Sequence, residues 1–440
     1  MKMLPISPRF ALLAFVIAFM LVRLTPTPTY TDAYYHFNAA ERLASGQGLT
    51  DAYLWNYIGA RDSLPQPSHL YWMPLTSLTA AAGMTLLNAP GDHAAAQVLL
   101  IPMLAITACV GFWLGKRLGG NARHAWLAGL LTLFSGFFVS FWGAIDTFTP
   151  YAFVGSLCLL TLGLAVERGR LVWWVLAGVF AGLGHLTRAD GMLLLILGVL
   201  MAIWLWDRVA LSQRTMRIVV LVASYALVMS PWFARNLTIS GSPLPLGGTQ
   251  AIWFRSYDDL FSYPPDASPA QFFADGVGTF IASRWEALTN NLGTFVIVEG
   301  LVILTPLMLI GLWVKRRERL LRPFWLYALG LHLAMTFAFP FPGTVIAELV
   351  GLGAEGVGLG ELCGRIVAGE EVGAVGDDEE VRLVEPVEAG LVAGVGLLGG
   401  DEALRTGQPV EHPAARAADD RRRRSGSGLD RHAAGKKPGG

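Results

Sequence analysis

The chain has 440 residues, of which 53% are hydrophobic and 15% are charged, and its formal net charge is zero. This composition is typical of a polytopic membrane protein, and the lack of a basic excess argues against a nucleic-acid partner. The sequence has no glycine-rich phosphate loop of the P-loop type and no dinucleotide fingerprint, so we do not expect a bound nucleotide to drive its chemistry.

The first hydrophobic segment covers residues 10–24 and is preceded by Lys2 and Arg9. Because no small-residue cleavage site follows it, we predict a membrane-spanning helix and not a cleaved signal peptide. Basic residues before a span favour the cytoplasmic side. We therefore expect the N-terminus in the cytoplasm and residues 25–95 outside.

A short amphipathic helix is predicted directly after this span, with Thr31 or Asp32 as its N-cap and Ser45-Gly46 at its end. One face of this helix is apolar and carries Ala33, Phe37, Ala40 and Ala44.

A carboxylate beside aromatic and imidazole groups, where the chain leaves the bilayer, suits acid–base chemistry on a substrate at the membrane surface. The candidates for such contacts with the substrate are Asp32, Tyr34, Tyr35, His36 and, further along the same outer region, His69. The alternative is that Asp32 only caps the helix.

Eight further apolar segments are long enough to be predicted as spans, which makes nine in all, the fold of an all-α polytopic membrane protein. They cover residues 97–115, 125–142, 151–166, 171–186, 191–206, 218–234, 295–314 and 323–341. Basic residues follow the second, fourth, sixth and eighth spans, and all lie on the cytoplasmic side if the segment 75–88 is an interfacial or re-entrant helix.

The same topology places four more elements on the outer face with Asp32. They are the loop 146–150, the turn 187–191, residues 235–236 and the long segment 237–294, which could form a helical lid.

Charged residues on this outer face suggest a site for a phosphate-bearing substrate. Asp32 and Asp146 can divide the work between a general base and an orienting group, or together hold a divalent cation. Arg188 and Arg235, at the outer ends of spans, suit a phosphate through parallel charge-assisted hydrogen bonds. Asp146 as a cap of the next helix and both arginines as interfacial anchors are the alternatives. Glu299, near the outer end of its span, is a further candidate for contact with the substrate.

The composition changes sharply near Thr344, since every Phe, Trp and Tyr lies at or before Phe341. We therefore divide the chain into a core, 1–344, and a Gly/Ala/Glu/Arg-rich tail, 345–440. The tail is either disordered or an out-of-frame translation of a GC-rich gene, and we favour the second interpretation. Cys363 lies in this tail, and none of the three cysteines has disulfide or metal-ligand spacing.

The order of these motifs resembles the GT-C superfamily of integral-membrane glycosyltransferases, and within it the protein-mannosyltransferase and aminoarabinose-transferase-like group, glycosyltransferase family 39. The resemblance covers about 1–344. It rests on the Asp-x-Tyr-Tyr of the first outer loop, Gly46-x-Gly48, the second outer Asp, Leu-Thr-Arg-Ala-Asp-Gly at 186–191 and Pro-Trp-x-x-Arg-Asn at 231–236.

The resemblance implies transfer of a sugar from a polyprenyl-phosphate donor to a protein, lipid or glycan acceptor, at the extracytoplasmic face of a bacterial or archaeal plasma membrane. It also implies that Asp32 is the general base. Family members commonly have two adjacent acidic residues at this site, whereas here Thr31 precedes a lone Asp32.

Two alternatives remain. The first half is also similar to the oligosaccharyltransferase catalytic subunit, although the Trp-Trp-Asp-Tyr-Gly motif is absent from this sequence. A non-enzymatic lipid-linked-sugar binding protein, flippase or transporter would place polar residues at mid-depth in the spans, where this sequence has few.

Overall fold

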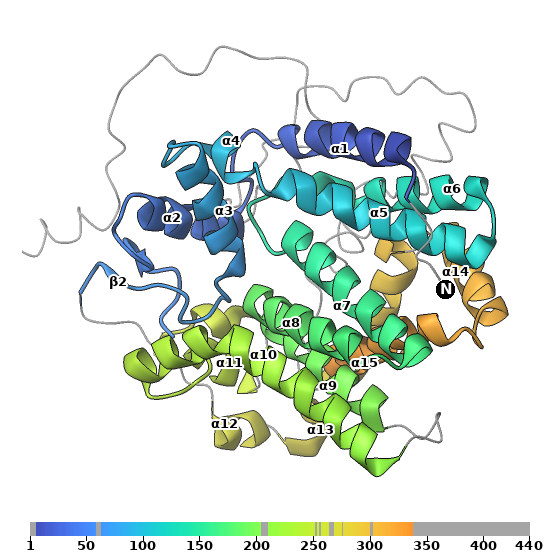
Figure 1. Ribbon diagram of the computed structural model, residues 1–440. Helices are drawn as coiled ribbons and strands as arrows, with labels where there is room; N and C mark the ends of the chain where they lie inside the picture. Colours follow the sequence, from blue (N-terminus) through green and yellow to red (C-terminus); the bar gives the residue numbers. More distant parts are fainter. Residues whose placement is uncertain are drawn as a thin grey trace, which may run out of the picture. The chain divides into compact units, whose positions relative to one another are not determined.

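The computed structural model describes residues 6–58, 63–203, 210–250, 253–254, 257–263, 268–274, 276–299 and 302–337. All of them belong to the first of two units, Met1–Asp377. The tail predicted at 345–440 lies outside the described residues, as does Cys363. The described part is mainly helical, with one small sheet (Figure 1).

The first group of helices packs around α1 and α5 (Figure 1). In this group α1 lies against α5 and α6, and α2 lies against α3. Phe10 of α1 is fully buried and stacks on Phe112 of α5, with ring centroids 4.4 Å apart. The members are α1 (Pro8–Arg23), α2 (Thr31–Ala44), α3 (Leu75–Leu86), α4 (His93–Ala96), α5 (Leu100–Gly119), α6 (Ala122–Leu133) and η1 (Gly136–Phe141).

The second group is built on α7, α8, α9 and α10, with α15 against α7 and α9. Gly178 of α8 lies so close to α10 that a Cβ there would meet the Leu221 carbonyl oxygen at 2.2 Å. Small residues allow such close helix–helix contact in membranes. The members are α7 (Phe148–Arg168), α8 (Leu171–Thr187), η2 (Ala189–Gly191), α9 (Met192–Ile203), α10 (Leu211–Ser240) and α15 (Arg322–Phe337).

The remaining elements are two short strands and the helices outside these two groups. Strands β1 (Thr50–Asp51) and β2 (Gln66–Pro67) pair antiparallel, with Asp51 opposite Gln66. The predicted lid segment, 237–294, is mainly helical in its described parts, and its role as a lid stays a prediction. The elements are α11 (Leu246–Gln250), η4 (Tyr257–Phe261), α12 (Pro269–Ala274), α13 (Gly276–Thr294), η5 (Phe295–Glu299), α14 (Leu304–Val314) and η6 (Arg319–Leu321).

Two predicted spans are not single α-helices. The segment 125–142 divides at Ser135, where Gly136 has a φ of 67° and the Trp142 indole N–H donates to the Leu133 carbonyl at the end of α6. The segment 295–314 begins as a π-helical turn, η5, and α14 starts only at Leu304, after Val302 at a φ of 58°. The other predicted spans overlap α1, α5, α7, α8, α9, α10 and α15, although residues 204–206 and 338–341 lie outside the described residues.

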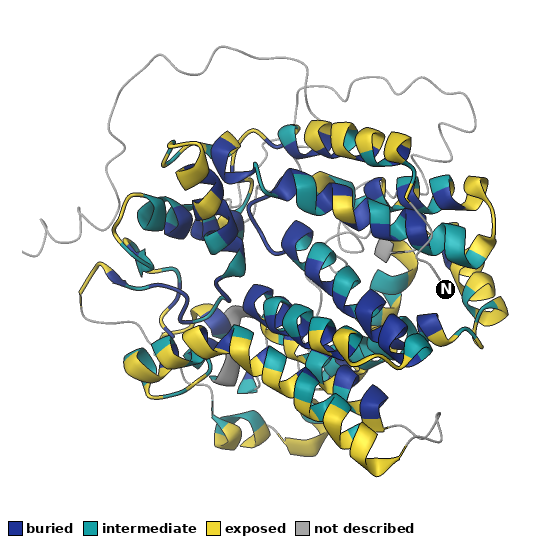
Figure 2. Cartoon of the chain, viewed as in Figure 1, coloured by how far each residue is buried: buried dark blue, intermediate teal, exposed yellow. Residues whose placement is uncertain are grey.

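Three described helical segments are long and apolar enough to cross a membrane: His93–Gly119, Phe148–Arg168 and Leu211–Ser240. The outward faces of α1 and α10 carry exposed large apolar side chains, such as Leu12, Met20 and Leu227 (Figure 2). Such faces suit contact with lipid. The twelve residues of α3 span about 18 Å, less than the hydrocarbon core of a bilayer. This short length fits an interfacial or re-entrant helix, and the count of nine spans stays a prediction.

The Gln97 side chain joins the end of α1 to the loop before α7. Gln97 is 1% exposed. Its amide nitrogen donates to the carbonyl oxygens of Val22, Thr25 and Gly143 at 3.0, 2.8 and 2.8 Å, and its amide oxygen accepts from Arg23 at 3.1 Å. Any side chain at Gly143 would collide with this junction, because its Cβ would lie 2.3 Å from the Val22 oxygen.

We expect Gln97→Glu to lower the free energy of unfolding by about 2 kcal/mol or more, because the variant replaces the donor by an acceptor facing buried carbonyls. The measurement is thermal unfolding in detergent micelles. Gln213→Glu, on the exposed surface of α10, is the matched control and should change stability by no more than about 0.5 kcal/mol. Equal unfolding midpoints for the two variants would contradict the role of Gln97.

Candidate functional site

Helix α2 begins at Thr31, so its N-cap precedes both predicted caps. Its N-cap is Tyr30, in an extended conformation and without a side-chain cap hydrogen bond. The prediction of Thr31 or Asp32 as N-cap is therefore wrong, because both residues already lie in the first helical turn. The predicted end is confirmed, with Ser45 as C-cap and Gly46 at a φ of 78°.

The buried face of α2 is wider than the predicted apolar stripe. Ala33 and Ala40 are buried as predicted, whereas Phe37 and Ala44 are only half-buried. Tyr35 and His36 are buried as well. The Tyr35 hydroxyl and His36 Nδ1 meet hydrogen-bond partners from neighbouring segments, whereas His36 Nε2 has no described hydrogen-bond partner.

Asp32 carries a carboxylate oxygen without a described partner. Its Oδ1 is buried and accepts no hydrogen bond within the described part of the chain. Burial, and next the charge of Asp146, raise the pKa of Asp32 to about 7, while a hydrogen bond with Thr31 and the charge of Arg188 act in the opposite direction. A carboxylate with this pKa exchanges protons readily near neutral pH, as a general base must.

Asp146 is held differently from Asp32. It is 6% exposed, its Oδ2 accepts from the Tyr30 hydroxyl at 2.5 Å and its Oδ1 accepts from the Thr147 backbone N–H at 2.5 Å. Helix α7 has Thr147 as N-cap, so Asp146 is not the cap of that helix. Its hydrogen bonds instead fix the carboxylate beside α2.

Arg188, at the C-terminal end of α8, lies at the same centre. Its Nε donates to Asp190 at 2.9 Å, one terminal nitrogen donates to the Thr147 hydroxyl at 3.3 Å, and its guanidinium lies 5.7 Å from the Tyr151 ring centroid. The side chain is 37% exposed. A guanidinium has five N–H groups, so Arg188 keeps donors for a ligand beside Asp32.

Arg235 lies in a different environment. One terminal nitrogen donates to the Ser68 carbonyl at 2.7 Å and to the Leu49 carbonyl at 3.4 Å, and the guanidinium stacks over Trp232 at 4.6 Å. These contacts clamp the segment that carries β1 and β2. The phosphate-binding role of Arg235 stays a prediction.

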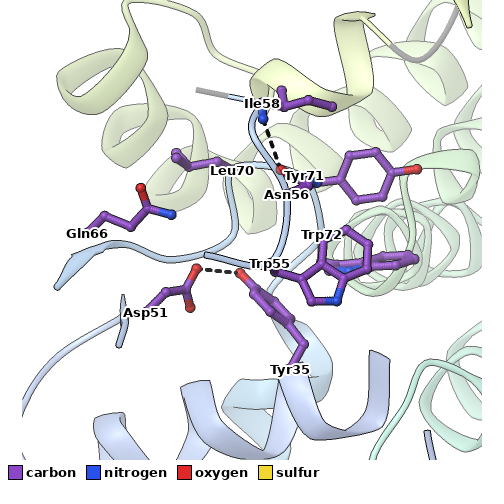
Figure 3. A pocket seen from close by; sticks show the side chains of 9 residues that line it. All are labelled: Tyr35, Asp51, Trp55, Asn56, Ile58, Gln66, Leu70, Tyr71 and Trp72. Atoms are coloured by element: carbon purple, nitrogen blue, oxygen red, sulfur yellow. Dashed lines mark hydrogen bonds between the residues drawn. The ribbon is translucent and has the colours of Figure 1, made fainter. Parts of the chain in front are cut away.

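A second carboxylate, Asp51, lies beside a pocket. The Tyr35 hydroxyl donates to Asp51 at 3.1 Å and accepts from the His69 backbone N–H at 2.5 Å (Figure 3). Burial raises the pKa of Asp51 to about 7, against the hydrogen bond from Tyr35 and the charges of Arg235 and Arg42. The pocket is lined by Tyr35, Asp51, Trp55, Asn56, Ile58, Gln66, Leu70, Tyr71 and Trp72.

The other predicted substrate-contact residues differ in their exposure to solvent. His36 and His69 are fully buried, and both lie within hydrogen-bond distance of Ser77. Tyr34 is 47% exposed, unlike its neighbours on the buried face of α2. The side chain of Glu299 lies outside the described residues.

Sequence reasoning missed Tyr30, Asp51 and Ser77. Tyr30 follows a Thr-Pro repeat and looks like the end of a linker, and Asp51 stands alone in a polar loop. Ser77 lies among small residues of α3 that were treated as interfacial. The Gly46-x-Gly48 turn was the one local signal, because it returns the chain towards α2 and so brings Asp51 near it.

An apolar groove runs between α9 and α15 and is connected to Arg188 through tyrosines. It is lined by Leu193, Ile196, Leu197, Leu200, Leu326, Tyr327, Leu329, Gly330, Leu331 and Leu333. The Tyr327 hydroxyl is hydrogen-bonded to that of Tyr151, whose ring lies beneath Arg188. The groove thus leads towards a cationic group.

The residues fit a metal ion only in part. Asp32 offers an oxygen without a partner, but both oxygens of Asp146 already accept hydrogen bonds. Within the described ranges, no group of three or more His, Cys, Asp or Glu side chains could hold a metal ion.

Two solved structures of the Archaeoglobus fulgidus oligosaccharyltransferase are similar to the chain at low identity. One is archaeal AglB in complex with an inhibitory peptide and a dolichol-phosphate, at 17% identity, a TM-score of 0.39, and coverage of 78% of this chain and 38% of that one. The other is the apo form, at 16% identity, a TM-score of 0.40, and coverage of 85% and 40%. The chain therefore matches about two fifths of the length of these proteins. No curated protein matches the chain.

The family model described as dolichyl-phosphate-mannose-protein mannosyltransferase matches residues 68–234. The matched segment begins at Ser68 and runs through α10 as far as the residue before Arg235, so it includes His69, Ser77, Asp146 and Arg188. Over this segment, the chain is similar to a family of the GT-C superfamily of integral-membrane glycosyltransferases.

Proposed function

We propose that this protein transfers a sugar from a polyprenyl-phosphate donor to an acceptor hydroxyl at the extracytoplasmic face of the membrane. The observation that carries the proposal is the Asp32 carboxylate, whose Oδ1 has no described partner, beside Asp146 and Arg188. A base, a fixed negative charge and a cation thus lie together where the chain leaves α1.

In the proposed reaction Asp32 takes the proton of the acceptor hydroxyl. The acceptor oxygen attacks the anomeric carbon, the bond from that carbon to the phosphate oxygen breaks, and the polyprenyl phosphate leaves with the bonding electrons. Arg188 stabilises the negative charge that develops on this leaving group, through hydrogen bonds to the phosphate oxygens. Asp146, whose charge raises the pKa of Asp32, strengthens the base.

The groove between α9 and α15 supports a lipid-linked donor. Its lining is almost entirely apolar, and it leads through Tyr327 and Tyr151 to Arg188. In an amphiphile with an anionic head and a hydrocarbon tail, the head matches Arg188 and the tail matches the apolar groove. The matched family's description names a dolichyl-phosphate-mannose donor and a protein acceptor, so mannose is the first sugar and a protein the first acceptor to test, before lipid and glycan acceptors.

A divalent cation at Asp32 and Asp146 stays a secondary proposal, and no step above depends on it. The expected topology, with the N-terminus in the cytoplasm of a bacterial or archaeal cell, follows from the basic residues that flank the spans. A lipid-linked-sugar flippase or binding protein is the competing function, and it requires no base at Asp32.

We expect Asp32→Asn to lower the rate of sugar transfer by about 10²–10⁴-fold, the usual contribution of a general base. The measurement is transfer of labelled mannose from polyprenyl-phosphate mannose in proteoliposomes. Asp92→Asn is the matched control, because Asp92 caps α4 through a hydrogen bond to Ala95 at 2.6 Å and Asn caps equally well. Full transfer by Asp32→Asn would refute the proposed base, whereas absence of transfer by the wild-type protein would favour the flippase.

The same variant should also change how stability depends on pH. The pKa of Asp32 is raised from 3.8 to about 7 on folding, so its contribution to stability is present below pH 4 and is lost as the pH rises through 7. Asp32→Asn should therefore be more stable than wild type above pH 7, by at most about 4 kcal/mol, and equally stable near pH 4. Thermal unfolding across this pH range is the measurement, and parallel curves would contradict the raised pKa.

We expect Arg188→Gln to raise KM for the polyprenyl-phosphate donor by about 10–100-fold, because it removes a charged hydrogen-bond donor to phosphate. Arg168→Gln is the control. Arg168 is the last residue of α7, at the opposite end of that helix from Tyr151, and its guanidinium lies 5.4 Å from the Trp173 ring centroid. Donor titration at saturating acceptor separates KM from kcat. An unchanged donor KM in Arg188→Gln would exclude this arginine from phosphate binding.

We expect Gly330→Trp to fill the groove between α9 and α15 and to raise KM about tenfold for a long-chain donor, because apolar contacts of the tail are lost. KM for a donor with a tail of two isoprene units should be the same as in the wild type. A Cβ at Gly330 meets no atom within 4 Å, and the same holds for Gly311 of α14, so Gly311→Trp is the matched control. Equal effects on both donors would show that the tail lies elsewhere.

A further inference from the structure

Four buried side chains form a line of hydrogen bonds that ends at His36, whose Nε2 has no described hydrogen-bond partner and faces Asp146. The Ser68 hydroxyl lies 2.7 Å from His69 Nδ1, and His69 Nε2 lies 3.0 Å from the Ser77 hydroxyl. The Ser77 hydroxyl lies 2.9 Å from His36 Nδ1, and His36 Nε2 lies 3.9 Å from Asp146 Oδ1. The line therefore connects the segment after β2 with α3, α2 and the loop before α7.

Every member of this line is fully buried, since Ser68, His69, Ser77 and His36 each have an exposed fraction of 0%. Because these side chains are shielded from water, their hydrogen bonds to one another determine which ring nitrogen of each histidine carries the proton. Their partners allow the hydrogen positions to be worked out one after another.

The direction of the line follows from its Asp146 end. Both oxygens of Asp146 accept hydrogen bonds, from Tyr30 and from the Thr147 backbone, as an ionised carboxylate does. A bare His36 Nε2 would point a lone pair at this carboxylate, so Nε2 carries the proton. In a neutral imidazole, Nδ1 is then the acceptor.

The remaining positions follow in turn. His36 Nδ1 accepts the hydroxyl proton of Ser77, so the Ser77 oxygen is left to accept, and it accepts from His69 Nε2–H. His69 Nδ1 is then bare and accepts from the Ser68 hydroxyl. Burial lowers the pKa of His36 to about 4 and that of His69 well below its ordinary value, and both rings are therefore neutral at pH 7.

We infer that Ser68, His69, Ser77 and His36 form a one-directional hydrogen-bond chain that fixes both histidines as Nε2–H tautomers and aims His36 Nε2–H at Asp146. The inference deepens the proposed function and rests on it for its catalytic consequence. His36 is a positioning residue, because it acts on Asp146 and has no described contact with Asp32.

The consequence is a fixed orientation for Asp146. The 3.9 Å gap exceeds hydrogen-bond distance, so His36 acts as an oriented dipole and places the positive end of its N–H towards Oδ1. With Tyr30 on Oδ2, the carboxylate is held from two sides. Because Asp146 raises the pKa of Asp32, its position sets the strength of the base.

The first experiment is a tautomer measurement on the full chain in lipid nanodiscs, by ¹⁵N NMR of histidine-labelled protein, with His36→Gln and His69→Gln to assign the signals. At pH 7 both rings should be neutral with the proton on Nε2. Ser77→Ala should convert His36 into a mixture of tautomers, because its Nδ1 loses the donor. A charged His36, an Nδ1–H tautomer in wild type, or an unchanged His36 signal in Ser77→Ala would overturn the inference.

The second experiment measures transfer by Ser77→Ala and by Thr76→Val. Both variants remove a buried hydroxyl from α3, but that of Thr76 has no described hydrogen-bond partner. Ser77→Ala should lower kcat about tenfold or more with an unchanged donor KM, since misplaced groups near the reacting atoms reduce the rate, and Thr76→Val should match wild type. Equal kcat values for the two variants would overturn the positioning role.

A third comparison uses His36 itself. His36→Gln places an amide N–H near the position of Nε2 and should retain more of kcat than His36→Leu, which has no donor. Equal rates would contradict the role of the N–H. The tautomer measurement needs no activity. Correct tautomers in a protein that transfers no sugar from a polyprenyl-phosphate donor would refute the proposed function alone, whereas transfer with the wrong tautomers would refute this inference alone.

Discussion

One buried amide joins the two chain segments that carry Asp32 and Asp146. Gln97 binds carbonyl oxygens at the end of α1 and just before the loop of Asp146. Carbonyls in such a place would otherwise lack donors, and an unsatisfied buried group costs about 1–3 kcal/mol. The distance between the two carboxylates therefore depends on a residue that touches neither. Gly143 completes the junction, because its lack of a side chain lets the loop approach α1 closely.

The two carboxylates take different roles because their surroundings differ. Tyr30 and the Thr147 N–H supply Asp146 with donors, whereas Asp32 Oδ1 has no described partner and is desolvated. Placing two carboxyl groups in different environments is a recurring way to divide acid–base work between them. Arg188 lies close enough to lower the pKa of Asp32, so a phosphate bound there would cancel part of its charge and make the carboxylate a stronger base. Donor binding and base strength are thus linked.

The helices were predictable from the sequence to the extent that each is a continuous apolar run. The runs that become α5, α7 and α10 end at basic or glycine residues and have few internal breaks. The predictions for 125–142 and 295–314 were wrong as single α-helices because Gly136 and Val302 adopt a positive φ, which an apolar run does not reveal. Local sequence also suggested Thr31 or Asp32 as the N-cap of α2, whereas the N-cap is Tyr30, whose hydroxyl contacts the distant Asp146.

The candidate site was predictable only through its charged residues. Asp32, Asp146 and Arg188 stand out as ionisable groups beside apolar segments, and the structure brings all three to one centre. Ser77 and Gln97 carry no such signal, since a serine or glutamine is ordinary until its partners are known. Those partners lie 41 and 8 residues from Ser77, and up to 75 residues from Gln97. Only the folded chain reveals these pairings.

Helix α10 extends beyond its apolar stretch. Its 30 residues extend for about 45 Å, whereas the apolar stretch 218–234 extends for about 25 Å, close to the thickness of the hydrocarbon core of a bilayer. Near its C-terminal end, α10 holds the carbonyls of Leu49 and Ser68 through Arg235, and Ser68 is the first member of the line that leads to Asp146. A helix long and apolar enough to cross a membrane thus also holds the segment from which that line starts.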